Sequence, residues 1–383
     1  MKINGKYYFL KLLNALLLLA MIFGCNKNAH DSQKMMTLDA VAYVVDFPKT
    51  FVLQNKEDTE IDIPGVWDFV IQDSMMILST RNSHGVWKFL SLPEHRELGN
   101  FLTVGGGPLE LSSQPSVSDK VKFVKEGNHL QAYLYDFGYG KLFRIDIGKT
   151  ILDQDLSMKI INDALPKYLF DFLVIDSTSY FCKEIANMET QQMRYLLSKG
   201  EKSIISPMQK LNAATVTANM DHNILSTMTR WSDKHKKVVE MHFGLNFINL
   251  YSLDNSSSKT ICVGKRPDNI ADIESLALED RMFQFSDVRI YDDFFGVVYV
   301  HEQESVYKNT RKNLPSILLF DWNGNPIAEL NSDSFITSFD IDFTQGELYT
   351  FDVKSDEFAK YDIADILLEI RSHQFEQGID GND

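Results

Sequence analysis

Two similar stretches, far apart in the chain, decide the fold: WDFVIQDSMMILST, residues 67–80, and FDFLVIDSTSYFCK, residues 170–183. Each joins two apolar runs through a polar Asp-Ser turn, which is the pattern of a β-hairpin. Asp68 and Phe69 of the first stretch match Asp171 and Phe172 of the second. A hairpin that recurs in one chain indicates a repeat architecture, so further copies are expected.

Further copies begin near residues 121, 224, 286 and 338, which spaces the hairpins about 50 residues apart, the size of one propeller blade. A second type of hairpin follows within each unit, as in LYDFGYGKLFRIDI from Leu134 and LFDWNGNPIAEL from Leu319. The sequence therefore predicts an all-β, six-bladed β-propeller with four antiparallel strands per blade. A pair of β-sandwiches with coincidental spacing is the alternative.

The chain divides into four predicted segments: a signal peptide at 1–24, a polar tether at 25–38, the propeller at 39–372 and a flexible tail at 373–383. Short helices are expected at residues 276–282 and 365–372. A propeller ring closes when a strand from one end completes the blade at the other end. We expect the strand-like run AVAYVVDF, Ala40–Phe47, to join the last blade in this way.

The first residues predict export and lipidation. Lysines precede a short apolar run that ends at Gly24-Cys25, as in a secretory signal, and the run is too short for an ordinary membrane span. The ending Ile22-Phe23-Gly24-Cys25 resembles a bacterial lipobox, so Cys25 is the predicted lipidation site. The alternative is an ordinary signal peptide with a chance cysteine. Asn26 stands where an aspartate commonly marks inner-membrane retention, which favours an outer-membrane lipoprotein.

Composition argues against a nucleic-acid partner and leaves open whether two cysteines form a disulfide. The net charge of −15 opposes binding to nucleic-acid phosphates, so no nucleic-acid partner is expected. Beyond Cys25 the chain has only Cys182 and Cys262, both in apolar strand-like runs. They pair in the exported protein or stay as two buried thiols, and the sequence leaves both possibilities open.

Six units, a lipobox and the run Gly105-Gly106-Gly107-Pro108-Leu109-Glu110 together resemble the TolB-like six-bladed propeller lipoproteins of Bacteroidetes. Members of that family commonly carry a GxGPGE-like turn after the first blade, and here Leu109 replaces its last glycine. The resemblance spans essentially the whole mature chain. It implies a propeller fold and an envelope location, and it transfers no catalytic residue.

The glycine run has two readings. It lacks the lysine and the following helix of a phosphate-binding loop, and Glu110 would repel phosphate. The run VGGGP is echoed by VGKRP at residues 263–267, three units further on, so the simplest interpretation is a crossover between blades. A binding role at the rim of the ring, carried by Gly105, Gly107 and Glu110, is the alternative.

Candidate metal ligands are four aspartates at similar points of their hairpins: Asp68, Asp171, Asp287 and Asp340. If they converge on the axis, their oxygens suit calcium, although aspartate is also an ordinary turn residue. No cofactor is otherwise expected. A metal-dependent hydrolase or lactonase with its site in the axial channel is the enzymatic alternative.

Two further places suggest ligand binding, because an arginine interrupts an otherwise apolar strand pattern. These are Arg81 and the pair Arg230-Trp231. An arginine beside an aromatic ring at the mouth of a propeller suits a glycan or a peptide. The alternative is that these are ordinary solvated or salt-bridged arginines. The expected function is therefore a non-catalytic binding or scaffold module, anchored to the membrane through its lipid, for a protein, peptide or glycan partner.

Overall fold

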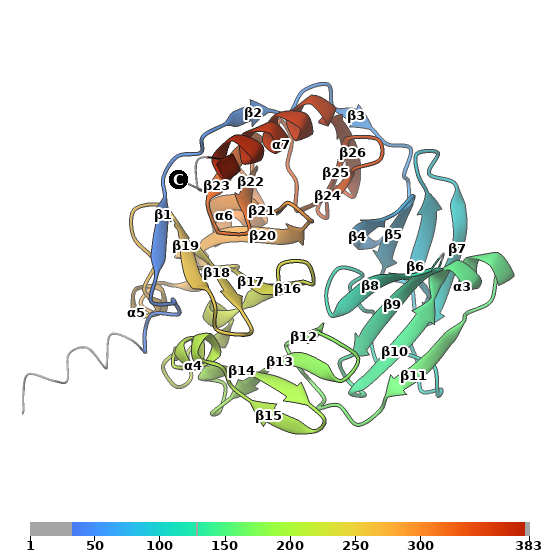
Figure 1. Cartoon of the computed structure of the whole chain (residues 1–383), viewed down its shortest axis with the longest axis horizontal. Helices are drawn as coiled ribbons and strands as arrows, with labels where there is room; N and C mark the ends of the chain where they lie inside the picture. Colours follow the sequence, from blue (N-terminus) through green and yellow to red (C-terminus); the bar gives the residue numbers. More distant parts are fainter. Residues whose placement is uncertain (1–32, 128, 380–383) are drawn as a thin grey trace, which may run out of the picture.

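A computed structural model describes residues 33–127 and 129–379, with side chains as far as residue 371, and shows six sheets arranged in a ring (Figure 1). Each sheet is one blade, and its four main strands are antiparallel. The predicted six-bladed propeller is therefore confirmed. The first strands of the six blades lie near the starts predicted from the repeat.

From the innermost strand outward, the first three blades are β4 (Val66–Gln72), β5 (Met75–Thr80), β6 (His84–Ser91) and β7 (Glu97–Thr103); β8 (Val121–Glu126), β9 (His129–Asp136), β10 (Lys141–Asp146) and β11 (Met158–Asn162); β12 (Asp171–Val174), β13 (Ser179–Ala186), β14 (Gln191–Ser198) and β15 (Glu201–Ser203). The last three are β16 (Thr227–Ser232), β17 (Lys237–His242), β18 (Phe247–Ser252) and β19 (Ser258–Val263); β20 (Met282–Ile290), β21 (Phe294–Gln303), β22 (Ser316–Asp321) and β23 (Pro326–Asn331); β24 (Ser338–Asp342), β25 (Glu347–Asp352), β26 (Glu357–Asp362) and β3 (Glu57–Asp58).

Short helices lie in the connections between strands: α3 (Ile147–Asp153), α4 (Ser206–Asn212), η1 (His222–Leu225), α5 (Ile270–Glu274), η2 (Leu278–Asp280) and α6 (Glu304–Asn309). The helix expected at residues 276–282 is only the 3-10 turn η2. The helix expected at 365–372 is confirmed as part of α7 (Ala364–Ile379), which continues into the segment assigned to a tail.

Six buried apolar layers hold the ring together, one between each pair of neighbouring blades. The layer that closes the ring joins the sixth blade to the first, where Phe69 packs edge-to-face on Phe358 with ring centroids 5.3 Å apart. Both faces of each blade are thus covered by a neighbour. This explains why the strands are apolar on both sides instead of alternating with polar residues.

Polar bonds near the axis supplement these layers, and the four repeated aspartates make them. Asp340 accepts a hydrogen bond from the amide N of Ile71 at 2.8 Å, and Asp287 accepts one from the amide N of Phe339 at 3.2 Å. Each bond joins the innermost strand of one blade to the next blade. Asp68 and Asp171 likewise reach the following blade, at Ser118 and Thr229. The repetition of aspartate therefore marks a repeated inter-blade contact.

The N-terminal segment closes the ring, but not through the strand that we expected. β1 (Val41–Val44) pairs in parallel with β19 of the fourth blade, and β2 (Thr50–Val52) pairs in parallel with β23 of the fifth blade. Only β3 pairs with β26 and completes the sixth blade. The assignment of Ala40–Phe47 to the last blade was wrong. An alternating pattern identifies a strand, whereas its partner depends on how much extended chain separates it from the first blade.

Residues 33–38, which the sequence assigns to the tether, lie against the fourth blade. Met36 and Leu38 are buried there. The side-chain amide of Asn249 donates to the carbonyl oxygen of Met36 at 3.0 Å, and the amide N of Leu38 donates to Thr260 Oγ1 at 2.8 Å. The signal peptide, Cys25 and the last residues of the chain lie outside the described residues.

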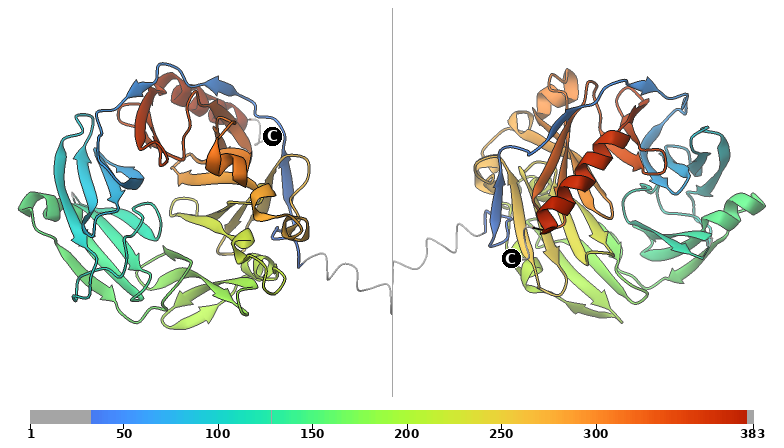
Figure 2. Two further views of the ribbon diagram at one scale, coloured as in Figure 1. Left: turned by 180° about the vertical axis from the view of Figure 1, so that it is seen from behind. Right: turned by 45° about the horizontal axis from the view of Figure 1, so that its top comes forward.

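Helix α7 lies across one face of the ring, over the layer between the fifth and sixth blades and beside the turn between β24 and β25 (Figure 2). Its residues Leu367 and Ile370 are buried in that layer. Across the described residues, no helix combines the length and apolar character that crossing a membrane requires.

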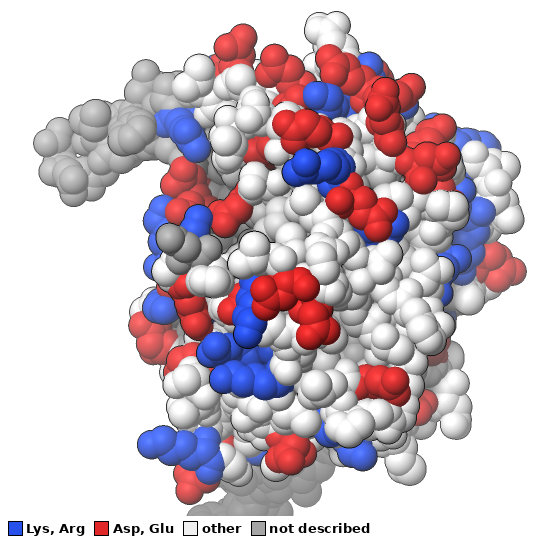
Figure 3. Space-filling view, turned by 90° about the vertical axis from the view of Figure 1, so that its right-hand side faces the viewer, with Lys and Arg blue, Asp and Glu red and all other residues white. Residues whose placement is uncertain are grey.

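Because strands alternate in direction, the ring has two distinct faces. One face carries the turns between the first and second strands of each blade, as at Asp73 and Asp233, and we call it the hairpin face. We call the crossover face the one where the chain passes to the next blade, as at residues 104–120. The side of the ring between the two faces mixes acidic and basic side chains without an extended basic surface (Figure 3).

Candidate functional site

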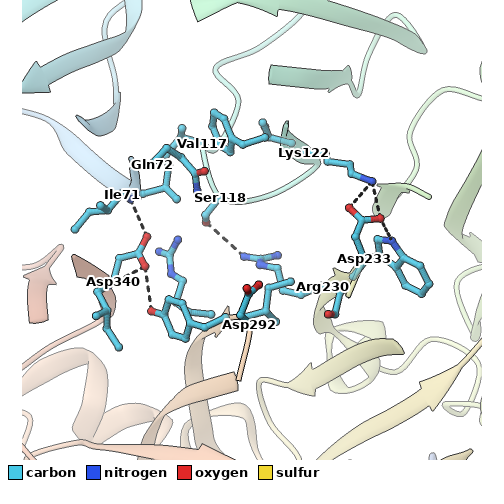
Figure 4. A pocket seen from close by; sticks show the side chains of 18 of the residues that line it. Ile71, Gln72, Val117, Ser118, Lys122, Arg230, Asp233, Asp292 and Asp340 are labelled. Atoms are coloured by element: carbon cyan, nitrogen blue, oxygen red, sulfur yellow. Dashed lines mark hydrogen bonds and ion pairs between the residues drawn. The ribbon is translucent and has the colours of Figure 1, made fainter. Parts of the chain in front are cut away.

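A large cavity lies on the ring axis and opens on the hairpin face. Its volume is about 590 Å³, and residues of all six innermost strands line it (Figure 4). Hairpin turns of four blades, at residues 73, 233–234, 292 and 343–344, form its mouth. A cavity of this size at the centre of a rigid ring suits a small ligand or the end of a chain. We call it the axial pocket.

The second and fourth blades, with the crossover that precedes β8, give the axial pocket a basic side. Lys120 comes from that crossover, Lys122 from the second blade and Arg230 from the fourth. Burial alone would lower the pKa of Lys120, but the carboxylates of Asp119 and Asp171 outweigh it and hold that pKa above its usual value. Lys120 is therefore charged.

Arg230 and Trp231, singled out in the sequence, both line the axial pocket. Arg230 is 9% exposed, and Figure 4 shows its side chain directed toward Ser118 across the pocket. Its Nη1 donates to the carbonyl oxygen of Thr229 at 3.0 Å, and its Nη2 donates to Ser118 Oγ at 3.4 Å. Trp231 Nε1 donates to Asp233 at 2.9 Å, which fixes the indole near the mouth. The two hydrogen-bond acceptors of the Arg230 guanidinium, the carbonyl oxygen of Thr229 and the hydroxyl of Ser118, are thus neutral.

The fifth, sixth and first blades give the pocket an acidic side around Arg289. The Arg289 guanidinium contacts Asp287 at 2.8 Å and Asp68 at 3.2 Å. Burial raises the pKa of Asp287 and of Asp340, and the nearby Arg289 charge only partly offsets that effect. Burial opposes the charge of Arg289, but these carboxylates outweigh it and raise the pKa of Arg289.

The candidate metal ligands do not form a metal centre. Asp68, Asp287 and Asp340 lie near one another around Arg289, whereas Asp171 pairs with the buried Lys183 in the third blade. Among residues 33–127 and 129–379, no group of three or more His, Cys, Asp or Glu side chains is placed to hold a metal ion. The oxygens of these aspartates accept hydrogen bonds from backbone, hydroxyl and cationic groups instead.

The glycine run lies on the crossover face, away from the axial pocket. Glu110 Oε2 accepts a hydrogen bond from the amide N of Gly107 at 2.6 Å, so this carboxylate closes its own loop. A Cβ on Gly105 would clash with Glu110 Oε2. The loop also bonds to the next blade, because Tyr139 donates its hydroxyl to the carbonyl oxygen of Gly105 at 2.8 Å. The run is therefore a compact crossover between the first and second blades.

The similar run VGKRP, residues 263–267, is also a crossover between blades. Gly264 follows β19 and leads from the fourth blade to the fifth, opposite the first crossover in the ring. Arg81 also lies on the crossover face, in the turn after β5, where its carbonyl oxygen accepts from Gln114. The structure thus brings Arg230 and Trp231 together in the axial pocket and places Arg81, Gly105, Gly107 and Glu110 elsewhere.

Sequence reasoning missed part of the pocket, namely Ser118, Lys120, Lys122 and Arg289. The signal that could have found Arg289 is the one that found Arg230, a cation within an innermost strand. Lys122 lies on the innermost strand β8, so its place near the axis follows from the repeat. Ser118 and Lys120 belong to an irregular crossover, for which no periodic pattern exists.

The two remaining cysteines are buried and unpaired, Cys182 in β13 and Cys262 in β19. Burial raises the pKa of Cys182 to about 12 and that of Cys262 to about 11. A thiol with such a pKa is protonated at neutral pH and is a poor nucleophile.

Comparisons with solved structures find similar chains at low identity. A member of the duf4221 family from Bacteroides vulgatus is 11% identical, with a TM-score of 0.48 over 82% of this chain and 97% of that one. A protein of unknown function from Bacteroides thetaiotaomicron is 8% identical, with a TM-score of 0.43 over 83% and 75%. The calcium-binding protein regucalcin from Agrobacterium tumefaciens is 12% identical, with a TM-score of 0.41 over 82% and 95%.

A search of curated protein sequences found no match. A family model does match, and it is described as TolB-like 6-blade propeller-like. The match covers residues 46–344, from the chain after β1 to the turn after β24 in the sixth blade. This protein belongs to the TolB-like six-bladed propeller family.

Proposed function

We propose that this protein is a non-catalytic binding module of the bacterial envelope. Its axial pocket binds part of a protein, peptide or glycan partner. The observation that carries the proposal is the position of Arg230 and Trp231. Two residues that interrupt an apolar strand pattern lie together in a pocket that opens on one face. A buried guanidinium without a strong carboxylate partner is costly unless a ligand uses it.

Hydrolysis in the axial channel is less well supported. The aspartates that such a mechanism requires at the axis are engaged in contacts between blades and with Arg289. Their carboxylates therefore stabilise the ring, and a second role as ligands of a catalytic metal would require them to give up these contacts.

A variant that fills the axial pocket tests the binding proposal. Gln72 lines the pocket and is half-buried, so Gln72→Trp places an indole in the cavity. We expect the small molecules or peptides that co-purify with the full-length protein from membranes of its own organism to fall at least about tenfold, as mass spectrometry of the released material measures. Gln209→Trp, on exposed α4 of the crossover face, is the matched control and should retain them. Equal retention by both variants would rule out the axial pocket as the site.

We also propose that lipidated Cys25 anchors the protein, most simply to the outer membrane. The charged and apolar residues before Cys25 and the absence of aspartate at position 26 support this location. Cys25→Ala is expected to move the protein from the membrane fraction to the soluble fraction on cell fractionation. Unchanged membrane association of the variant would contradict lipid anchoring.

A further inference from the structure

We propose that the axial pocket takes the free C-terminal carboxylate of a peptide whose last side chain is apolar, and that Arg230 binds this carboxylate. The inference rests on the proposed binding function and names the chemistry that the same pocket recognises. Three observations carry it: the charge balance of the basic side, the geometry of Arg230, and the apolar walls.

The charge balance leaves one cation on the basic side without a close carboxylate. The other cations that line this side are paired: Lys120 with Asp119, Lys122 with Asp233, and Lys234 with Asp293. Arg230 makes one long ion pair, with Asp119 at 3.8 Å from Nη1, although Asp119 binds Lys120 more closely; the Arg230 charge also reaches the buried carboxylate of Asp287. Within the part of the chain that the structure describes, Arg230 thus contributes one net positive charge to the pocket.

One net positive charge matches a ligand with one negative charge. On the opposite side Arg289 and Asp340 line the pocket, and Arg289 is already paired with Asp68 and Asp287, so a phosphate with two charges would meet repulsion there. A carboxylate is a monoanion, and its two oxygens fit the planar fork of a guanidinium.

The geometry of Arg230 favours recognition over simple charge attraction. Its side chain is nine-tenths buried, and its contacts with Thr229 and Ser118 fix the guanidinium before a ligand arrives. A fixed, poorly solvated cation binds an anion more strongly than an exposed lysine does, because less water and less side-chain freedom are lost on binding.

Part of the pocket wall is apolar, which favours an apolar group attached to the carboxylate. Aliphatic side chains from five blades line the pocket: Ile71, Val117, Val121, Leu173, Ile290 and Ile341. Trp231 and the exposed ring of Phe343 stand at the mouth. An apolar side chain beside a terminal carboxylate buries against these walls, whereas the hydroxyl groups of a sugar acid would lose their hydrogen bonds to water.

The test compares a free acid with its amide on the full-length protein. The probes are N-acetyl-Gly-Gly-Phe, the same peptide with a C-terminal amide, and D-glucuronate, and saturation-transfer NMR titration gives each Kd. We expect the acid to bind at least about tenfold more tightly than the amide, the loss expected when a charge-assisted hydrogen bond is removed. Arg230→Met should abolish this preference, and Arg230→Lys should keep part of it. Lys210→Met, on the crossover face, should leave it unchanged.

Each other outcome has a defined meaning. Equal binding of acid and amide that Gln72→Trp removes would overturn the carboxylate inference and leave the binding pocket standing. Tighter binding of D-glucuronate than of the peptide acid would overturn the peptide as ligand. Absence of binding by every probe up to about 10 mM would overturn the inference as well, while the co-purification experiment would still decide the proposed function. Melting curves of the two Arg230 variants establish that they are folded.

Discussion

Arg194→Met is expected to lower the free energy of unfolding by about 3–5 kcal/mol, because it leaves a buried carboxylate without its partner. Arg194 and Glu240 are both fully buried, between the third and fourth blades. Arg194 Nε lies 2.9 and 2.8 Å from the two carboxylate oxygens of Glu240. After the substitution, Glu240 keeps the hydrogen bond from the Tyr251 hydroxyl but loses the two contacts with the guanidinium. Urea titration of the wild type and the variant measures the loss.

Two further variants separate the buried ion pair from ordinary surface charge. Lys210→Met removes an exposed ion pair with Asp39 and should cost no more than about 1 kcal/mol. The double variant Arg194→Met with Glu240→Gln should recover part of the loss, because no unpaired charge then stays buried. A loss below about 1 kcal/mol for Arg194→Met alone would contradict the account.

Removing the segment before residue 46 is expected to cost about 5 kcal/mol or more. A chain that begins at Asp46 lacks β1 and the buried side chains of Met36, Leu38 and Val44, each of which contributes about 1.5–3 kcal/mol by burial. It also removes the groups that bond to Asn249 and Thr260. The unfolding midpoint in urea should fall accordingly.

The matched control is a chain that begins at Gln33 and keeps every contact of this segment. Its stability should equal that of the longer protein. If the chain that begins at Asp46 were as stable as this control, residues 33–45 would contribute nothing to the stability of the propeller.

The repeat made the fold predictable, because a recurring hairpin fixes the number of blades and the start of each. Asp68 and its three counterparts were found by the same repeat, but their role was not. A sequence shows that aspartates recur at one position, whereas only the structure shows that backbone N–H and hydroxyl groups of the next blade occupy their oxygens. For that reason the structure does not support a metal site at these four aspartates.

Part of the candidate site was predictable, because Arg230 is a charge within an apolar strand and such a residue needs a special environment. The glycine run was conspicuous for another reason, its close-packed turn around Glu110. The partner of β1 was not predictable, since strand pattern carries no information on which edge a parallel strand joins.

The central claim is that the axial pocket binds the ligand through Arg230. A crystal structure of the full-length protein isolated from the membranes of its own organism tests this claim most directly. The account predicts a bound molecule in the axial pocket with an acidic group within hydrogen-bond distance of the Arg230 guanidinium. A bound molecule on the crossover face beside residues 105–110, with none in the axial pocket, would contradict it.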